Sequence, residues 1–128
     1  MTDLLAQGAA WLEAQRHAHC TSAVAYVRGE ASVDLLATIG RTIFEQSDAY
    51  GIVERTEARD FLVRAEDLVL DGAVALPERG DRVRETVGAQ VLVYEVMAPG
   101  NEPHYRYSDA YRWTLRIHTK HVDTEEAS

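Results

Sequence analysis

The residues with the chemistry to bind a metal are few, and they stand in two places in the chain. One group is His17, His19 and Cys20, and the other is the pair His118 and His121. On a helix, side chains two positions apart diverge by about 200°, so the first two histidines could share an ion only in an extended segment. No CxxC or HxxxH set supplies further ligands. The spacing therefore predicts no metal site, and the second pair is interpreted as surface histidines at a strand end.

Nucleophilic catalysis also lacks its usual patterns. Cys20 is the single cysteine, and without a nucleophile motif around it we interpret it as a small buried hydrophobe. The chain has no GxSxG, Walker or GxGxxG motif. The pairs Glu66–Asp67 and Glu125–Glu126 are adjacent in sequence, which suits solvation and not acid–base work across a cleft. We therefore expect no catalytic residue, no cofactor and no enzymatic activity.

Composition narrows the class of protein further. With 128 residues, of which 46% are hydrophobic, the chain has the size and composition of a single domain. Its net charge of −8 argues against general nucleic-acid binding, because Lys and Arg supply most of the non-specific affinity for phosphates. No run approaches the roughly 20 apolar residues that cross a bilayer, and no basic export signal opens the chain. We expect synthesis in the cytoplasm and no membrane contact.

A helix is predicted over residues 2 to about 18. Leu4, Leu5, Trp11 and Leu12 recur at helical spacing, and Thr2 and Asp3 are possible caps. The apolar stripe is narrow, so the helix could pack on its own domain or reach a neighbouring subunit. The sequence leaves both arrangements open.

From about residue 22 the apolar period changes to two, which predicts strands. Asp71-Gly72 predicts a two-residue hairpin turn, Pro77 excludes a central strand, and Gly80-Asp81 predicts a second turn. In the last strand, Tyr111, Trp113, Leu115 and Ile117 fall on one face, which predicts that Trp113 lies in the core. The strands are predicted at residues 22–27, 33–39, 41–45, 52–56, 59–64, 82–85, 90–97 and 111–118.

Residues 45–59 form a long polar segment, in which residues 46–51 could be an ordinary hairpin tip or a protruding loop. Residues 98–110 are predicted to be an exposed loop or arm, and residues 123–128 an acidic disordered tail. The fold class that follows is mainly β: a small β-barrel or sandwich with one N-terminal α-helix and long inter-strand loops. The domain is predicted to span residues 1–122.

The order of these features resembles that of the head–tail joining proteins of lambda-like long-tailed phages, also called head-completion, head-closure or stopper proteins. The resemblance covers nearly the whole chain. It is carried by the N-terminal helix, the polar loop, the stretch DFLVRAEDL at 60–68, the turn ERGDRV at 78–83 and two closing strands. The acidic end and the long final hairpin depart from the family pattern.

The resemblance implies a β-barrel that joins the DNA-filled head to the tail and helps to close the DNA channel, without catalysis. It implies a ring of about six copies in the virion neck, made in the host bacterial cytoplasm. The partners would be the portal or adaptor ring, the tail terminator or tail tube, and other copies of the chain. Double-stranded DNA would pass without sequence-specific binding.

The resemblance also implies two sets of site residues. The family's long loop corresponds to residues 44–56 and would project toward the channel or the next ring, where its carboxylates would repel phosphate. Its candidate residues are Glu45, Gln46, Ser47, Asp48, Ala49, Tyr50, Gly51 and Glu54. Contacts to neighbouring subunits would come from Leu4, Leu5, Trp11, Leu12, Tyr105 and Tyr107, since apolar and aromatic anchors concentrate interface energy.

Two other functions are compatible with the sequence. One is a tail terminator, which would pack two helices on a sheet and show more than about a third helix by circular dichroism. The other is a small-molecule-binding or hydrolytic β-barrel that uses His17, His19 or Cys20. A stoichiometric bound metal, or activity lost in a Cys20→Ala variant, would identify the latter.

Overall fold

The computed structural model describes residues 21–47, 49–100 and 102–127. Nearly all of the regular structure in this part of the chain is β-strand, interrupted by a short 3-10 turn, η1 (Ala65–Asp67). The strands are β1 (Thr21–Arg28), β2 (Ala31–Ser47), β3 (Val53–Arg64), β4 (Val69–Leu70), β5 (Ala73–Val74), β6 (Arg82–Val87), β7 (Gln90–Val96), β8 (Tyr105–Tyr107) and β9 (Thr114–Glu126). The mainly β class is confirmed, and the predicted helix over residues 2–18 lies outside the described residues.

The strands form one large antiparallel sheet and one small hairpin. In the sheet the order is β3-β2-β1-β6-β7-β9-β8, and β3 also pairs with β9. The pairing therefore returns to its first strand. β3, β2, β1, β6 and β7 each have two hydrogen-bonded neighbours, and β9 has three, namely β7, β8 and β3. β4 and β5 pair only with each other.

Alternation along the strands builds the core. Val24 and Tyr26 of β1 and Leu115 and Ile117 of β9 occupy every second position and are buried, as a period of two requires. Phe61 and Tyr94 meet edge-to-face with ring centroids 5.3 Å apart. Further buried members are Leu35, Val63, Leu68, Val83 and Val96.

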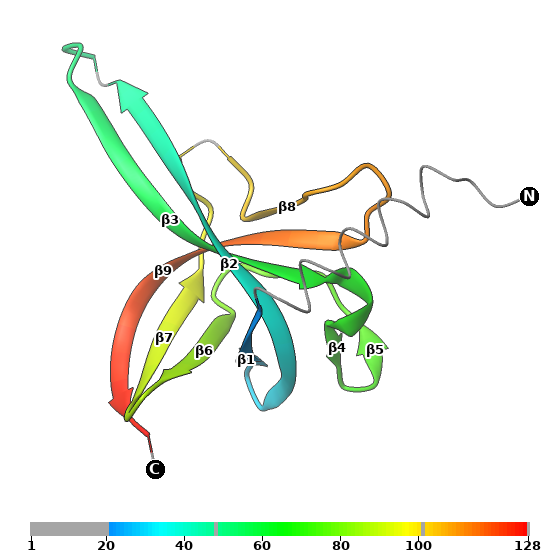
Figure 1. Ribbon diagram of the computed structural model, residues 1–128. Coiled ribbons are helices and arrows are strands. Elements are labelled where there is room, and N and C mark those ends of the chain that lie inside the picture. Colours follow the sequence, from blue (N-terminus) through cyan, green and yellow to red (C-terminus); the bar gives the residue numbers. More distant parts are fainter. Residues whose placement is uncertain (1–20, 48, 101, 128) are drawn as a thin grey trace, which may run out of the picture.

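The β2–β3 hairpin extends beyond the rest of the sheet. β1 pairs with β2 only as far as Thr38, and β9 pairs with β3 only from Arg59 onward. Between these limits β2 and β3 continue to pair with each other out to Ser47 and Val53. Figure 1 shows the resulting two-stranded ribbon projecting away from the other strands, at the upper left. We call residues 42–58 the arm. The rest of the sheet, which includes the remaining parts of β2 and β3, is called the body.

The turn predictions are confirmed. Val69 pairs with Val74 and Leu70 with Ala73, and Asp71 and Gly72 both have positive φ, at 53° and 82°, as a two-residue hairpin of this kind needs. Residues 75–81, which include Pro77, lie between β5 and β6 outside any strand, and residues 79 and 80 form a turn.

The predicted interruptions of β2 and β3 are wrong. Segments 33–39 and 41–45 belong to one strand, and so do segments 53–56 and 59–64. Gly40, which lies between the two predicted segments, pairs with Asp60 inside the ladder. A Cβ at Gly40 would lie 3.2 Å from Nη2 of Arg116, so the glycine makes room for a neighbouring side chain and does not turn the chain.

The predictions for the final strand need two corrections. β9 begins at Thr114, because the Asp109 carboxylate accepts hydrogen bonds from the backbone N–H groups of Tyr111, Trp113 and Thr114 and folds residues 109–113 into a turn. Trp113 is 36% exposed and stacks on Tyr111 at 5.2 Å, so its predicted place in the core is wrong.

Residues 123–126 form the end of β9 and pair with Gln90–Val93 of β7, so the disordered tail is also wrong over these positions. The predicted loop at 98–110 contains β8, a three-residue strand on β9.

Candidate assembly surface: the arm and its root

The arm displays apolar side chains on a thin ribbon. Tyr50 at the tip is 90% exposed, and Ile43, Ile52 and Val53 are also exposed. A two-stranded ribbon has little interior in which to bury such groups. Apolar side chains gathered on a projecting element are typical of a surface that binds another protein.

Charged side chains on the arm, and Arg41 just before it, pair across β2 and β3. Arg41 Nη1 lies 3.5 Å from Glu57 Oε1, and Arg55 Nε lies 3.5 Å from Glu45 Oε1. All four side chains are well exposed, so each pair adds little stability. They place opposite charges across the ribbon, so the polar segment can pair without repulsion between like charges.

Among the described residues, no strand lies beside the backbone edges of the arm. Beyond Thr38, β2 pairs only with β3, and before Arg59, β3 pairs only with β2. Unpaired edges offer N–H and C=O groups to a strand of another chain. The arm therefore combines exposed apolar side chains with two edges able to accept a partner.

A buried carboxylate lies at the root of the arm. Asp60 on β3 is fully buried and accepts hydrogen bonds from the Thr42 hydroxyl and from Arg116 Nε at 2.6 Å. His118 Nδ1 lies 2.8 Å from the other carboxylate oxygen. Because an ionised carboxylate only accepts, that ring nitrogen carries the proton. We call Asp60, Thr42, Arg116 and His118 the root cluster.

The root cluster holds the pKa of its carboxyl group down. Burial alone raises the pKa of Asp60, but the hydrogen bonds from His118, Thr42 and Arg116 outweigh it, so the pKa lies below its ordinary value. The carboxylate is charged and satisfied, but closed to solvent, and His118 is itself buried with the ring of Phe44 against it at 5.3 Å. This Asp–His pair is therefore not placed to take a proton from a substrate, and its predicted surface position is wrong for His118.

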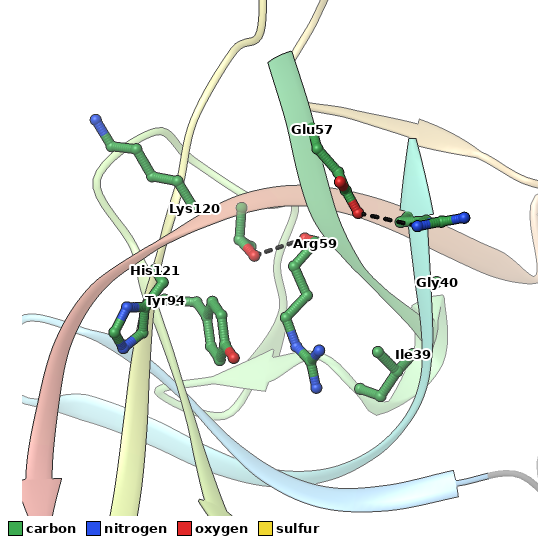
Figure 2. A pocket seen from close by; sticks show the side chains of 9 residues that line it. Ile39, Gly40, Glu57, Arg59, Tyr94, Lys120 and His121 are labelled. Carbon is green, nitrogen blue, oxygen red and sulfur yellow. Dashed lines mark hydrogen bonds and ion pairs between the residues drawn. The ribbon is translucent and has the colours of Figure 1, made fainter. Parts of the chain in front are cut away.

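A second ion pair crosses from β3 to β6 beside the root. Arg59 Nη2 lies 2.5 Å from one oxygen of the buried Glu85 and 2.7 Å from the other. The guanidinium also stacks 5.0 Å above the Tyr94 ring. Figure 2 shows Arg59 between Tyr94 and Ile39, in an open cavity of about 600 Å³ with Lys120 and His121 at its rim. Because the Arg59 guanidinium already pairs with Glu85, we interpret this cavity as part of the structure at the arm root and not as a ligand site.

A similar buried carboxylate lies at the far end of the body. β1 runs from Thr21, beside Thr38 at the arm root, to Arg28, beside Ala31 at the opposite end. There Asp81 accepts hydrogen bonds from the Tyr26 hydroxyl, from Arg28 Nη2 at 2.8 Å and from the Glu78 backbone N–H at 3.0 Å. We call Asp81, Tyr26 and Arg28 the far-end cluster. Burial and the bond to Asp81 raise the pKa of Tyr26, so the phenol stays neutral.

The site residues expected from the sequence fall into three groups. Glu45, Gln46 and Ser47 lie in β2 and Glu54 lies in β3, so the polar loop is mostly strand, with Ala49, Tyr50 and Gly51 in the tip. Tyr105 and Tyr107 are half-buried on the core, away from the arm. Leu4, Leu5, Trp11, Leu12 and Asp48 lie outside the described residues.

Sequence reasoning missed the root cluster. The available signal was a lone aspartate, Asp60, directly before the apolar run Phe61–Val63. A carboxylate at such a position is buried only if it finds donors, and those donors lie far along the chain at Arg116 and His118. The sequence does not show that these segments meet.

Within residues 21–47, 49–100 and 102–127, no group of three or more His, Cys, Asp and Glu side chains is arranged to hold a metal ion. No helix in this same part of the chain is long and apolar enough to cross a membrane. The described residues contain one 3-10 turn and no α-helix, so they do not show the two helices packed on a sheet that a tail terminator would need.

Comparison with known proteins supplies the family. No curated protein matches the chain. Residues 2–126 match the family described as phage head–tail joining protein, which agrees with the resemblance in the order of sequence features. The match spans nearly the whole chain, so the chain belongs to the phage head–tail joining proteins, which are structural proteins of the phage neck.

Proposed function

We propose that this protein joins head to tail as a subunit of a ring in the virion neck, and that the arm makes the contact with the adjoining neck component. The adjoining components would be the portal or adaptor ring on one side and the tail terminator or tail tube on the other. The family supports the joining role. The observation that carries the role of the arm is its projection beyond the body with exposed apolar side chains and two open edges.

In this proposal the body is a small β-barrel that works as a non-enzymatic support. The cyclic order of strand pairing, from β3 through β2, β1, β6, β7 and β9 back to β3, is what a closed barrel requires. A closed sheet leaves few edges and holds the arm on a stiff base. A ring of about six such subunits would place several arms around one axis.

Double-stranded DNA passes through the ring without sequence-specific binding. Residues 41–57 contain Arg41 and Arg55 against Glu45, Asp48, Glu54 and Glu57, which gives the segment a net charge of 2 − 4 = −2. A negative surface repels phosphate, and this suits a smooth passage or a closure better than a binding site.

Shortening the arm tests its role. Because Glu45 and Arg55 are directly opposite, replacing residues 46–54 by Asn-Gly joins them with a two-residue turn and leaves the root intact. In a phage that lacks its own copy of the gene, we expect this variant to fold with nearly unchanged thermal stability and to give no infectious particles. Filled heads and free tails should accumulate. Normal infectivity from the shortened chain would overturn the proposal.

A matched pair of point variants sharpens the test. Val53 on the arm and Val87 at the β6–β7 turn are 55% and 53% exposed, so Val53→Lys and Val87→Lys should have equally small effects on stability. We expect only Val53→Lys to lower the yield of infectious particles, because only that side chain lies on the arm. An equal loss in both variants would point to a general effect of charge and not to the arm.

A further inference from the structure

In the part of the chain that the structure describes, the arm joins the body through β2 and β3, and such a ribbon has little to fix its direction. At its root β2 has left β1 and β3 has not yet met β9, since Thr38 and Arg59 are the last positions with an outer neighbour. A two-stranded hairpin is marginal by itself in water. Among the described residues, the groups able to fix the direction in which the arm points are therefore the side chains at the root.

The root cluster links both strands of the arm to β9. Asp60 on β3 accepts from Thr42 on β2, and from Arg116 and His118 on β9. Arg116 Nη2 also donates to the backbone carbonyl of Arg41 at 3.1 Å. Three strands thus meet at one carboxylate that is completely closed to solvent.

Two neighbouring residues extend this contact. Phe44 lies two residues beyond Thr42 on the same face of β2, and its ring meets His118 edge-on. Gly40 lies on the other side of Thr42, where an added Cβ would stand 3.2 Å from Nη2 of Arg116, a tight contact that the glycine avoids. Gly40 and Phe44 therefore lie against Arg116 and His118 of β9, and Thr42 between them reaches Asp60 of β3.

We infer that Asp60 is a positioning residue, and that the root cluster fixes the direction in which the arm leaves the body. Stability alone is a weak reason for such a cluster, because apolar residues of similar volume are often as stabilising as a buried ion pair. A buried charge with several directional donors, by contrast, admits few alternative arrangements. The inference rests on the proposed function only for its consequence in assembly, since the direction of the arm can be measured in the isolated protein.

The far-end cluster supplies a matched control. Asp81 is also buried, at 4% exposure, and also accepts from an arginine and a hydroxyl group. It ties β1 to the turn before β6 at the end of β1 remote from the arm. Asp81→Asn should therefore lower stability as Asp60→Asn does, without affecting the arm.

The experiment measures the distance between arm and body. In a Cys20→Ser background, Glu54→Cys on the arm and Gln90→Cys on β7 carry spin labels, and double electron–electron resonance gives the distance distribution. We expect one narrow distribution in the parent, loss of that single distance in Asp60→Asn, and retention in Asp81→Asn. A narrow distribution in Asp60→Asn, or equal broadening in both variants, would overturn the inference.

A milder variant keeps the test usable if Asp60→Asn does not fold. Thr42→Val removes a single hydroxyl donor from the root cluster while β3 and β9 stay unchanged. It should broaden the distribution in part, and an unchanged distribution would count against the inference. The two proposals fail in different experiments. Normal infectivity of the chain with the shortened arm would contradict the role of the arm in assembly and would not affect the inference about Asp60. An unchanged distance distribution in the root-cluster variants would contradict only the role of Asp60.

Discussion

At the scale of single residues, two buried carboxylates define the two ends of the body. Asp60 and Asp81 each accept hydrogen bonds from an arginine and a hydroxyl group. Burial raises the pKa of Asp81 too, but the hydrogen bonds from Arg28 and Tyr26 outweigh it, so its pKa is low like that of Asp60. Both groups are therefore ionised in the folded protein at neutral pH.

These two carboxylates predict loss of stability in acid. Between the low folded pKa and the unfolded value of about 4, the unfolded chain binds more protons, so the free energy of unfolding rises with pH. The contribution is complete above about pH 4 and disappears as pH falls through the folded-state pKa. Urea denaturation over a pH series measures it. Asp60→Asn and Asp81→Asn should each flatten the acid limb, and a free energy of unfolding that stays constant below pH 4 would contradict the prediction.

Leu115 and Trp113 were both predicted to face the core, but they differ in burial. Leu115 is fully buried, so Leu115→Ala should cost about 2–5 kcal/mol. Trp113 is partly exposed and loses mainly its stacking on Tyr111, so Trp113→Ala should cost about 1–2 kcal/mol. Chemical denaturation of both variants gives the comparison. A larger loss for Trp113→Ala would place its side chain in the core after all.

At the scale of elements, hydrophobic alternation predicted where strands lie better than where they end. The period of two located parts of β1, β2, β3, β6, β7 and β9, because it reflects burial of one face. It failed at Gly40, where the glycine serves a close approach by Arg116, and in the charged stretch 54–59, where the charges pair across the arm. Both failures have one cause: the partner that makes the residue acceptable lies on another strand.

The end of β9 is a third example, and it can be tested by truncation. The carboxylates at 123–126 suggested a solvated tail, but these residues pair with β7, and Glu125 forms an ion pair with Arg84. Ending the chain after Val122 should cost on the order of 1–3 kcal/mol, through lost backbone hydrogen bonds worth about 0.5–1.5 kcal/mol each. Thermal denaturation measures the loss. Glu125→Gln should cost less than about 1 kcal/mol, since both partners are partly exposed. An unchanged melting temperature in the truncated chain would show that residues 123–126 add no stability, as the prediction of a disordered tail implied.

At the scale of the whole molecule, the sequence predicted the mainly β class and the family. Of the candidate site it predicted the projecting segment 44–56, but neither the two strands that build the arm nor the root cluster. Class and family follow from local patterns, namely the strand period, the turns at Asp71-Gly72 and Gly80-Asp81, and the order of segments. The arm and its root depend on contacts between residues as distant as Thr42 and Arg116. Such contacts form only when β3 and β9 are neighbours, and no local sequence pattern predicts that pairing.

The closed order of strand pairing also bears on how the isolated protein would behave in a test tube. Each of the six strands in that order has a neighbour on both sides, so within the described residues long open edges are found chiefly along the arm. Crowding in a concentrated sample would bring arms together before any other surface, since edges and apolar side chains coincide there. Aggregation of the purified protein and docking in the virion would then depend on the same surface. A chain with a shortened arm would be easier to crystallise.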